Sequence, residues 1–157
     1  PIDDAIVAFE RGEHERAAAL FETLILAAGG ANAAALDVVA TSADAHASIG
    51  ERAVAERRYV QAIRAAPADA FLRTRYAALL TARGDAERAL RQLGRVEPAA
   101  RSSADPTFRA IVFTEIARAL AATGDRSRAV DAARAAIAAE PEYAPARRLL
   151  DRLDRRR

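Results

Sequence analysis

Four glycines in this chain are each followed by an acidic residue, and an alanine stands five residues after every one of them. The pairs are Gly12-Glu13, Gly50-Glu51, Gly84-Asp85 and Gly124-Asp125, and the alanines are Ala17, Ala55, Ala89 and Ala129. Another alanine lies seven residues before each glycine, at Ala5, Ala43, Ala77 and Ala117. The glycines are 38, 34 and 40 residues apart, a period typical of solenoids that stack one supersecondary unit on the next. The recurrence therefore predicts a repeat architecture.

Composition decides which kind of repeat this is. Hydrophobic residues make up 52% of the 157 residues, but much of that share is alanine, the best helix former, and aromatic residues make up only 5%. Residues that favour strands never alternate with polar ones over a useful length. We predict an all-α chain whose helices approach one another closely through small side chains.

The pattern around each glycine predicts a helix, a tight turn and a second helix. Glycine ends the first helix in a left-handed conformation, and the acid that follows caps the second. The first helices are predicted at residues 3–11, 33–49, 70–83 and 106–123, and the second helices at 15–28, 52–66, 86–96 and 127–139. Pro67, Pro141, Gly29-Gly30 and the turn-like stretch 97–105 are predicted to close the second helices. A final amphipathic helix at 144–155 is predicted to cover the end of the stack.

Large apolar residues follow helical spacing in these segments and are predicted to form the core between helices. They are Leu20, Phe21, Leu24, Val54, Tyr59, Ile63, Leu90, Leu93, Val96, Phe113, Ile116 and Leu120.

This arrangement resembles the tetratricopeptide repeat family. The repeat at 36–68 matches it best, with Ala43, Gly50, Glu51, Ala55, Tyr59, Ala62 and Pro67 in place. The resemblance implies a right-handed α-solenoid of about four helix-turn-helix repeats, at about 1–30, 33–68, 70–98 and 106–141, plus a C-terminal capping helix at 144–155. All of it is predicted to form a single domain.

In this family the first helices line a concave groove that holds a peptide, a helix or another protein. The resemblance therefore implies a non-catalytic interaction scaffold whose partner is a protein or peptide. Helical spacing gives the residues that line such a groove: Ile6, Phe9, Asp37, Thr41, Asp44, Phe71, Thr74, Arg75, Ala78, Ile111, Thr114, Glu115 and Arg118.

The charged members of that set suggest two kinds of contact. Asp37 and Asp44 share a helix face and could pair with a basic partner, while Arg75 and Arg118 could hold an acidic group. A solvated face with internal ion pairs is the alternative. The groove constellation of Lys and Asn that some family members use for terminal carboxylates is missing, because the chain has no Lys and its only Asn is Asn32.

Catalytic and metal chemistry find little support in the sequence. The chain has no Cys and no Lys, and its glycines are isolated at turns rather than grouped in a phosphate loop. His14 is predicted to be an exposed partner of neighbouring acids, and His46 to be packed and hydrogen-bonded on the core side of its helix. We predict no enzymatic activity, no cofactor and no metal.

The charge pattern argues against nucleic acid as a partner. Formal net charge is only +2, all 24 basic residues are Arg, and acids lie close to most of the Arg pairs. Arginine as the sole base, beside abundant alanine, indicates a bacterial, GC-rich coding bias. The terminal triplet at 155–157 is the best candidate for a weak anionic contact.

Several questions stay open at this stage. The longest uncharged stretch, residues 23–36, is too short to span a bilayer, so a soluble protein without a membrane span is expected. The chain starts at Pro1 without Met, which leaves both a cytoplasmic location and a periplasmic one after signal-peptide removal open. A monomer or weak homodimer is expected. Two alternative functions remain: carriage of a small hydrophobic, lipid-like ligand in the same groove, or a regulatory or oligomerisation module of a longer protein.

Overall fold

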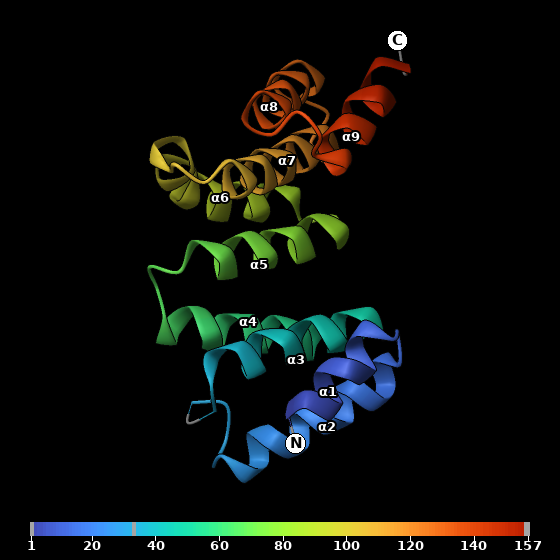
Figure 1. Ribbon diagram of the computed structural model, residues 1–157, viewed down its shortest axis with the longest axis vertical. Coiled ribbons are helices and arrows are strands. Elements are labelled where there is room, and N and C mark those ends of the chain that lie inside the picture. The colour runs from blue at the N-terminus through green and yellow to red at the C-terminus, as the bar shows by residue number, and fades with distance from the viewer. Residues whose placement is uncertain (1, 33, 156–157) are drawn as a thin grey trace. The chain divides into compact units, whose positions relative to one another are not determined.

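The computed structural model describes residues 2–32 and 34–155, and within these ranges the chain consists of α-helices and turns without a strand (Figure 1). The helices are α1 (Ile2–Glu10), α2 (His14–Ala27), α3 (Leu36–Ser48), α4 (Arg52–Ala65), α5 (Ala70–Ala82), α6 (Ala86–Ser102), α7 (Pro106–Ala122), α8 (Arg126–Ala139) and α9 (Ala144–Arg155). The all-α prediction is confirmed. The chain divides into two compact parts, Pro1–Leu72 and Arg73–Arg157, here named the N-terminal lobe and the C-terminal lobe.

Each Gly-acid pair ends the first helix of a hairpin in the same way. At Gly84 the φ angle is +85°; the Gly84 amide donates to the Thr81 carbonyl over 3.0 Å, and the Asp85 amide donates to the Leu80 carbonyl over 2.9 Å. This pair of bonds is the Schellman motif, which needs a left-handed residue at its centre. The same two bonds recur at Gly12, Gly50 and Gly124. The prediction that these glycines end the first helices is confirmed.

Whether the acidic residue after each glycine caps the next helix depends on the length of its side chain. The side chains of Asp85 and Asp125 accept hydrogen bonds from backbone amides in the first turn of α6 and α8, as predicted. Glu13 and Glu51 make no such cap bond, so the capping prediction is wrong for these two. Glutamate is one methylene longer than the preferred capping residue, and both carboxylates bond side chains instead: Glu13 bonds Arg16, and Glu51 bonds His46.

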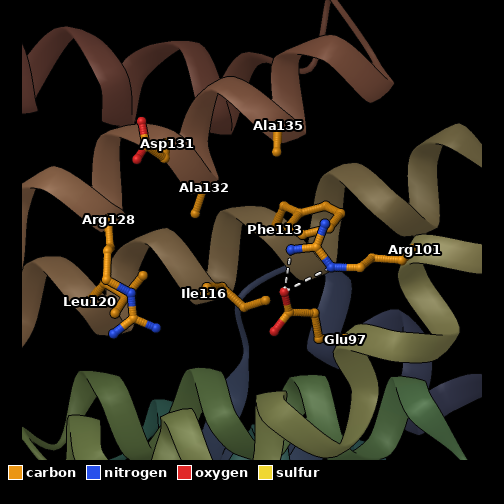
Figure 2. Close-up of a pocket in the computed structure, with 9 residues that line it drawn as sticks. All are labelled: Glu97, Arg101, Phe113, Ile116, Leu120, Arg128, Asp131, Ala132 and Ala135. Atoms are coloured by element: carbon orange, nitrogen blue, oxygen red, sulfur yellow. Dashed lines mark hydrogen bonds and ion pairs between the residues drawn. The ribbon is translucent and has the colours of Figure 1, made fainter.

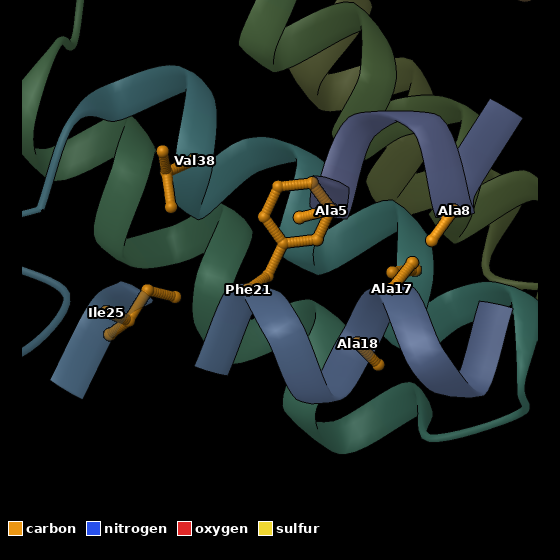
Figure 3. Packing of buried hydrophobic residues seen from close by; sticks show 8 residues of the cluster. Ala5, Ala8, Ala17, Ala18, Phe21, Ile25 and Val38 are labelled. Atoms are coloured by element: carbon orange, nitrogen blue, oxygen red, sulfur yellow. The ribbon is translucent and has the colours of Figure 1, made fainter. Parts of the chain in front are cut away.

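In the N-terminal lobe α1, α2 and α3 share one apolar cluster built around the ring of Phe21 (Figure 3). Phe21, Ala5 and Ala17 are 0% exposed, and Ile25 and Val38 are also buried. The small residues allow the helices to approach until they contact the ring. A second cluster joins α3, α4 and the start of α5 through buried residues that include Val39, Ala62 and Leu72.

The repeated alanines occupy the same kind of place in both lobes. All eight are 0% exposed, as expected of small residues where helices pack against one another; they are Ala5, Ala17, Ala43, Ala55, Ala77, Ala89, Ala117 and Ala129. Protein interiors are packed almost without voids, so a larger side chain at such a crossing would push the helices apart. The sequence repeat is therefore a packing repeat.

In the C-terminal lobe α9 packs on α7 and α8. Leu149 and Leu153 are buried, whereas Arg148 and Asp151 face solvent. Arg126 ties the end of the helix down, because its Nε donates to the Leu153 carbonyl over 2.9 Å. This agrees with the predicted bounds and amphipathic pattern of the last helix. Arg156 and Arg157 of the predicted anionic contact lie outside the described residues.

Two predicted helix bounds differ from the structure by more than one residue. The first concerns α3, which begins at Leu36 after an extended Ala35; the predicted start, residue 33, lies outside the described residues. The second is larger: α6 continues to Ser102, so the stretch 97–102 is helix and the prediction of a turn there is wrong.

Pro98 therefore lies inside α6, at a position that normally costs a helix about 3 kcal/mol. Contacts of the residues around the proline offset that cost. Ala100 is 0% exposed, Glu97 and Arg101 form an ion pair one helical turn apart at 2.5 Å, and the guanidinium of Arg101 lies 5.2 Å from the centre of the Phe113 ring. The helix extends because its last turns pack on α7.

None of the helices in the described ranges combines the length and the apolar character that crossing a bilayer requires.

Candidate binding surfaces

The first helix of the N-terminal lobe carries an exposed apolar pair with acids at both ends. Ile6 is 36% exposed and Val7 41%, and Asp3 and Glu10 are exposed at the positions that complete the same helix face. Among the described residues, neither Asp3 nor Glu10 has an ion-pair partner. We name these four residues the α1 stripe. One of its members, Ile6, is a predicted groove residue.

Phe9, the other predicted groove residue of α1, lies differently. It is half-buried against the Phe21 cluster, and its ring meets that of His14 edge to face at 5.3 Å. His14 is therefore half-buried beside an aromatic ring, and its Nδ1 is buried without a hydrogen-bond partner. The prediction of an exposed His14 paired with acids is wrong, because the turn at Gly12 brings its ring back onto α1.

On α3 the two predicted acids have separate environments. Asp37 is exposed and accepts a hydrogen bond from the Val38 amide. Asp44 is half-buried and accepts a hydrogen bond from the hydroxyl of Tyr59, a fully buried side chain of α4. Thr41 lies half-buried between them in the sequence. Only Asp37 is thus exposed in the way that the predicted pairing with a basic partner requires.

The predicted residues of α5 and α7 divide into exposed and buried ones. Phe71 is 51% exposed, and Arg75, Ala78 and Ile111 are half-buried. Thr74 and Thr114 are buried and do not form part of an accessible groove surface, which corrects the prediction for these two. Thr114 is 1% exposed, and its hydroxyl donates to the Ala110 carbonyl one turn earlier over 2.7 Å, so this side chain serves helix packing.

Glu115 and Arg118, the last two predicted groove residues, pair with each other at 2.5 Å. Burial raises the pKa of Glu115 above its ordinary value, although the charge and hydrogen bond of Arg118 act in the opposite direction. The Glu115 side chain is 12% exposed, whereas that of Arg118 is 39% exposed and stays in contact with water. Here the alternative of a face with internal ion pairs describes the structure.

A testable consequence concerns Glu115→Gln. Because the folded-state pKa is raised, the stability that this group contributes is present below its unfolded value of 4.5 and is lost as pH rises through the folded value. We expect the variant to match the parent at pH 4 and to be more stable by about 1 kcal/mol at pH 7. Urea unfolding followed by circular dichroism measures this. If Glu115→Gln lost more stability at pH 7 than Glu87→Gln, an exposed control on α6, the prediction would be contradicted.

His46 belongs to a polar cluster between α2, α3 and α4. Its Nδ1 lies 2.6 Å from a Glu51 oxygen and its Nε2 lies 3.1 Å from a Glu22 oxygen. Glu22 also accepts two bonds from Arg58, at 3.1 and 2.6 Å, and one from the hydroxyl of Ser42 at 3.2 Å. His46 is 6% exposed, which confirms the prediction of a packed, hydrogen-bonded histidine.

A different surface lies on the other face of α7. A cavity of about 220 Å³ is bounded by α6, α7 and α8, and its apolar floor is made by Phe113, Ile116 and Leu120 of α7 (Figure 2). In Figure 2 the guanidinium of Arg101 lies beside the Phe113 ring, with Glu97 next to it. The α8 wall carries Arg128, Asp131, Ala132 and Ala135.

A second cavity, of about 320 Å³, adjoins the first and shares Arg101, Phe113 and Ala135 with it. Its other lining residues are Arg109 and the alanines 138 and 139, so its lining contains two arginines and no acid. We name the two cavities together the α7 furrow. The floor residues 109, 113, 116 and 120 follow helical spacing, and the predicted groove residues 111, 114, 115 and 118 lie on the opposite side of the same helix.

Sequence reasoning missed the α7 furrow for a specific reason. The sequence predicts Phe113, Ile116 and Leu120 only as core residues, and Arg101 falls within the stretch 97–105 that is predicted to be a turn. The signal that could have found it is the spacing Val96–Ala100 and Glu97–Arg101, an apolar pair and an ion pair that continue the helical pattern beyond the proline.

Catalytic machinery is not apparent at any of these surfaces. Within residues 2–32 and 34–155 no group of three His, Cys, Asp or Glu side chains could hold a metal ion. No protein-family model and no curated protein matches the sequence. Solved structures do resemble it.

The Sgt2 TPR domain from Aspergillus fumigatus has a TM-score of 0.67 to this chain at 21% identity, over 77% of this chain and 78% of that one. The chain has the tetratricopeptide repeat fold. MamA from Desulfovibrio magneticus RS-1, from residue 41 to its end, is similar over 98% of this chain and 81% of its own length, with a TM-score of 0.76 at 18% identity. The assignment to the class of all-α solenoids built from tetratricopeptide repeats is therefore confirmed.

Proposed function

We propose that this protein is a non-catalytic scaffold that binds a partner protein or peptide through the exposed faces of the first helices in its N-terminal lobe. The observation that carries this proposal is the position of the exposed large apolar side chains. Four such residues stand out in the described ranges, and three of them, Ile6, Val7 and Phe71, lie on first helices. Exposed apolar residues that lie together on one face mark interaction surfaces more often than isolated ones do.

The charges of the N-terminal lobe indicate which kind of partner segment would bind it. The segments α1 and α3 carry five acids, Asp3, Asp4, Glu10, Asp37 and Asp44, and no arginine. The apolar pair of the α1 stripe thus lies between carboxylates. A partner segment with apolar side chains flanked by Arg or Lys is complementary to this surface, and opposite charges on the two sides favour association and orientation.

The test uses a defined probe and matched variants. A fluorescein-labelled helical peptide of Leu and Arg, and its analogue with Glu in place of Arg, are titrated with the full chain in anisotropy experiments. We expect the Arg peptide to bind and the double change Ile6→Ser and Val7→Ser to weaken it about tenfold, equivalent to about 1.4 kcal/mol. Leu26→Ser, which changes a residue of α2 that is 75% exposed, serves as the control.

Two results would contradict the proposal: equal binding of both peptides, or equal weakening by the control. Native mass spectrometry of freshly purified protein addresses the alternative of a hydrophobic carrier, since a retained lipid-like mass that is lost on changing Ile6 and Val7 would favour that function. Affinity capture from cells with the parent and the double variant then identifies the natural partner.

A further inference from the structure

We propose that the α7 furrow is a second binding site, which takes an extended peptide segment of a partner protein with a large apolar side chain next to an acidic one. The site lies in the C-terminal lobe and does not depend on the first-helix surface proposed above. Its shape, its floor and its charges each restrict the occupant.

The volume of each cavity suits one large side chain. An apolar cavity of about 150 Å³ is enough for a benzene molecule, whereas ligand pockets for small molecules range from about 300 to 1,000 Å³. The first cavity, about 220 Å³, lies between these values, and the adjoining one, about 320 Å³, lies at the lower end of the small-molecule range. Each therefore accommodates one large side chain, and the two together accommodate neighbouring side chains of an extended chain.

The floor of the first cavity is apolar although it opens to the surface. Phe113, Ile116 and Leu120 are contributed by α7, and the facing α8 wall has only alanine at 132 and 135. Because these alanines are small, they leave open the space above the Phe113 end of the floor. A leucine or phenylalanine from a partner would bury apolar area there, at about 25 cal/mol per Å².

The charges of the α7 furrow select the side chain next to the apolar one. Arg101 has its countercharge in Glu97, and Arg128 in Asp125. Arg109 has no carboxylate partner among the described residues, and its Nε is buried without an acceptor. Buried donors are nearly always hydrogen-bonded, so a ligand carboxylate in this cavity would give the guanidinium the acceptor and the countercharge that it lacks.

A polyanion such as nucleic acid fits less well. Glu97 and Asp131 line the first cavity and would repel a continuous row of phosphates, while the apolar floor offers them no contact. Arg109, which has no carboxylate partner in the part of the chain that the structure describes, lies beside an apolar cavity, and this arrangement is complementary to a ligand with one carboxylate next to one apolar side chain.

The experiment uses the full chain and two labelled ten-residue peptides, one with Leu and Phe alternating with Glu, the other with Gln in place of Glu. Anisotropy titrations at low and physiological salt give the dissociation constants. We expect the Glu peptide to bind about tenfold more tightly than the Gln peptide and Arg109→Gln to remove that difference. Arg134→Gln, an exposed arginine of α8 that lines neither cavity, removes the same charge and should change binding less than twofold.

A second variant tests the cavities themselves. Ala135→Leu adds three side-chain carbon atoms where the two cavities meet, and we expect both peptides to lose binding at least tenfold. Ala99→Leu, an exposed alanine of α6 outside both cavities, is the matched control, and circular dichroism confirms that each variant is folded.

Three results would overturn the proposal. The first is equal affinity for the Glu and Gln peptides, the second is equal weakening by Arg109→Gln and Arg134→Gln, and the third is unchanged binding in Ala135→Leu. Displacement of the Glu peptide by free 4-phenylbutyrate at the same affinity would also overturn it, in favour of a site for free organic acids. Because the α1 stripe is intact in all these variants, their outcome is separate from that of the Leu and Arg peptide.

Discussion

Replacing Phe21 with alanine is expected to lower the free energy of unfolding by about 3–5 kcal/mol. The ring is 0% exposed and lies in the cluster that joins α1, α2 and α3. Its neighbours include Ala5 and Ala17, whose methyl groups cannot move far enough to fill the space that the ring leaves, because closer approach is limited by the helix backbones. The cavity would therefore remain, and both the lost burial and the cavity contribute to the loss.

The measurement is urea unfolding followed by circular dichroism at 222 nm, because the chain has no tryptophan. Leu26→Ala on the same helix is the control; this side chain is 75% exposed, and its truncation should change stability by less than about 0.5 kcal/mol. Hydrogen exchange should locate the loss of protection for Phe21→Ala in α1, α2 and α3. A change no larger than that of Leu26→Ala would show that the helices collapse onto the site.

Much of this fold is specified by short-range signals that a sequence displays directly. Gly84 and its three equivalents supply the left-handed residue of a Schellman turn, and Ala117 and its equivalents lie where helices cross. Both requirements fix a residue type at a fixed position of the repeat, so both are visible in the sequence. The bounds of α9 were predicted to the residue. These features are local, and their residue types are nearly the only ones that the geometry permits.

The errors arose where a distant contact outweighed a local preference. Pro98 favours the end of a helix, yet α6 passes through it because Ala100 and Arg101 pack on α7. The α7 furrow depends on that extra helix, so it could not be predicted from local signals. Thr114 shows the same limit on a smaller scale, since helical spacing gives the side of a helix but not how much of that side a neighbour covers.

The polar cluster at Glu22 gives the second large effect. Burial raises the pKa of this carboxyl, but the hydrogen bonds and charges of Arg58 and His46 outweigh burial and hold the pKa below its ordinary value of 4.5. The partners are well covered, since the side chains of Arg58 and His46 are 17% and 7% exposed. Glu22→Gln leaves both without their shared carboxylate, and we expect a loss of about 2 kcal/mol at pH 7.

The pH dependence separates this electrostatic effect from a simple packing defect. A carboxyl whose folded-state pKa is lowered contributes stability above its unfolded value of 4.5, and that contribution is lost as pH falls through the folded value. The difference between the parent chain and Glu22→Gln should therefore be largest near neutral pH and shrink below pH 4.5, as the parent carboxyl becomes protonated. Urea unfolding at pH 7, 5 and 3.5 measures it, with Glu15→Gln, an exposed residue of α2, as the control. If the difference stayed constant across this range, the hydrogen-bonding shape of the side chain rather than its charge would hold α2, α3 and α4 together.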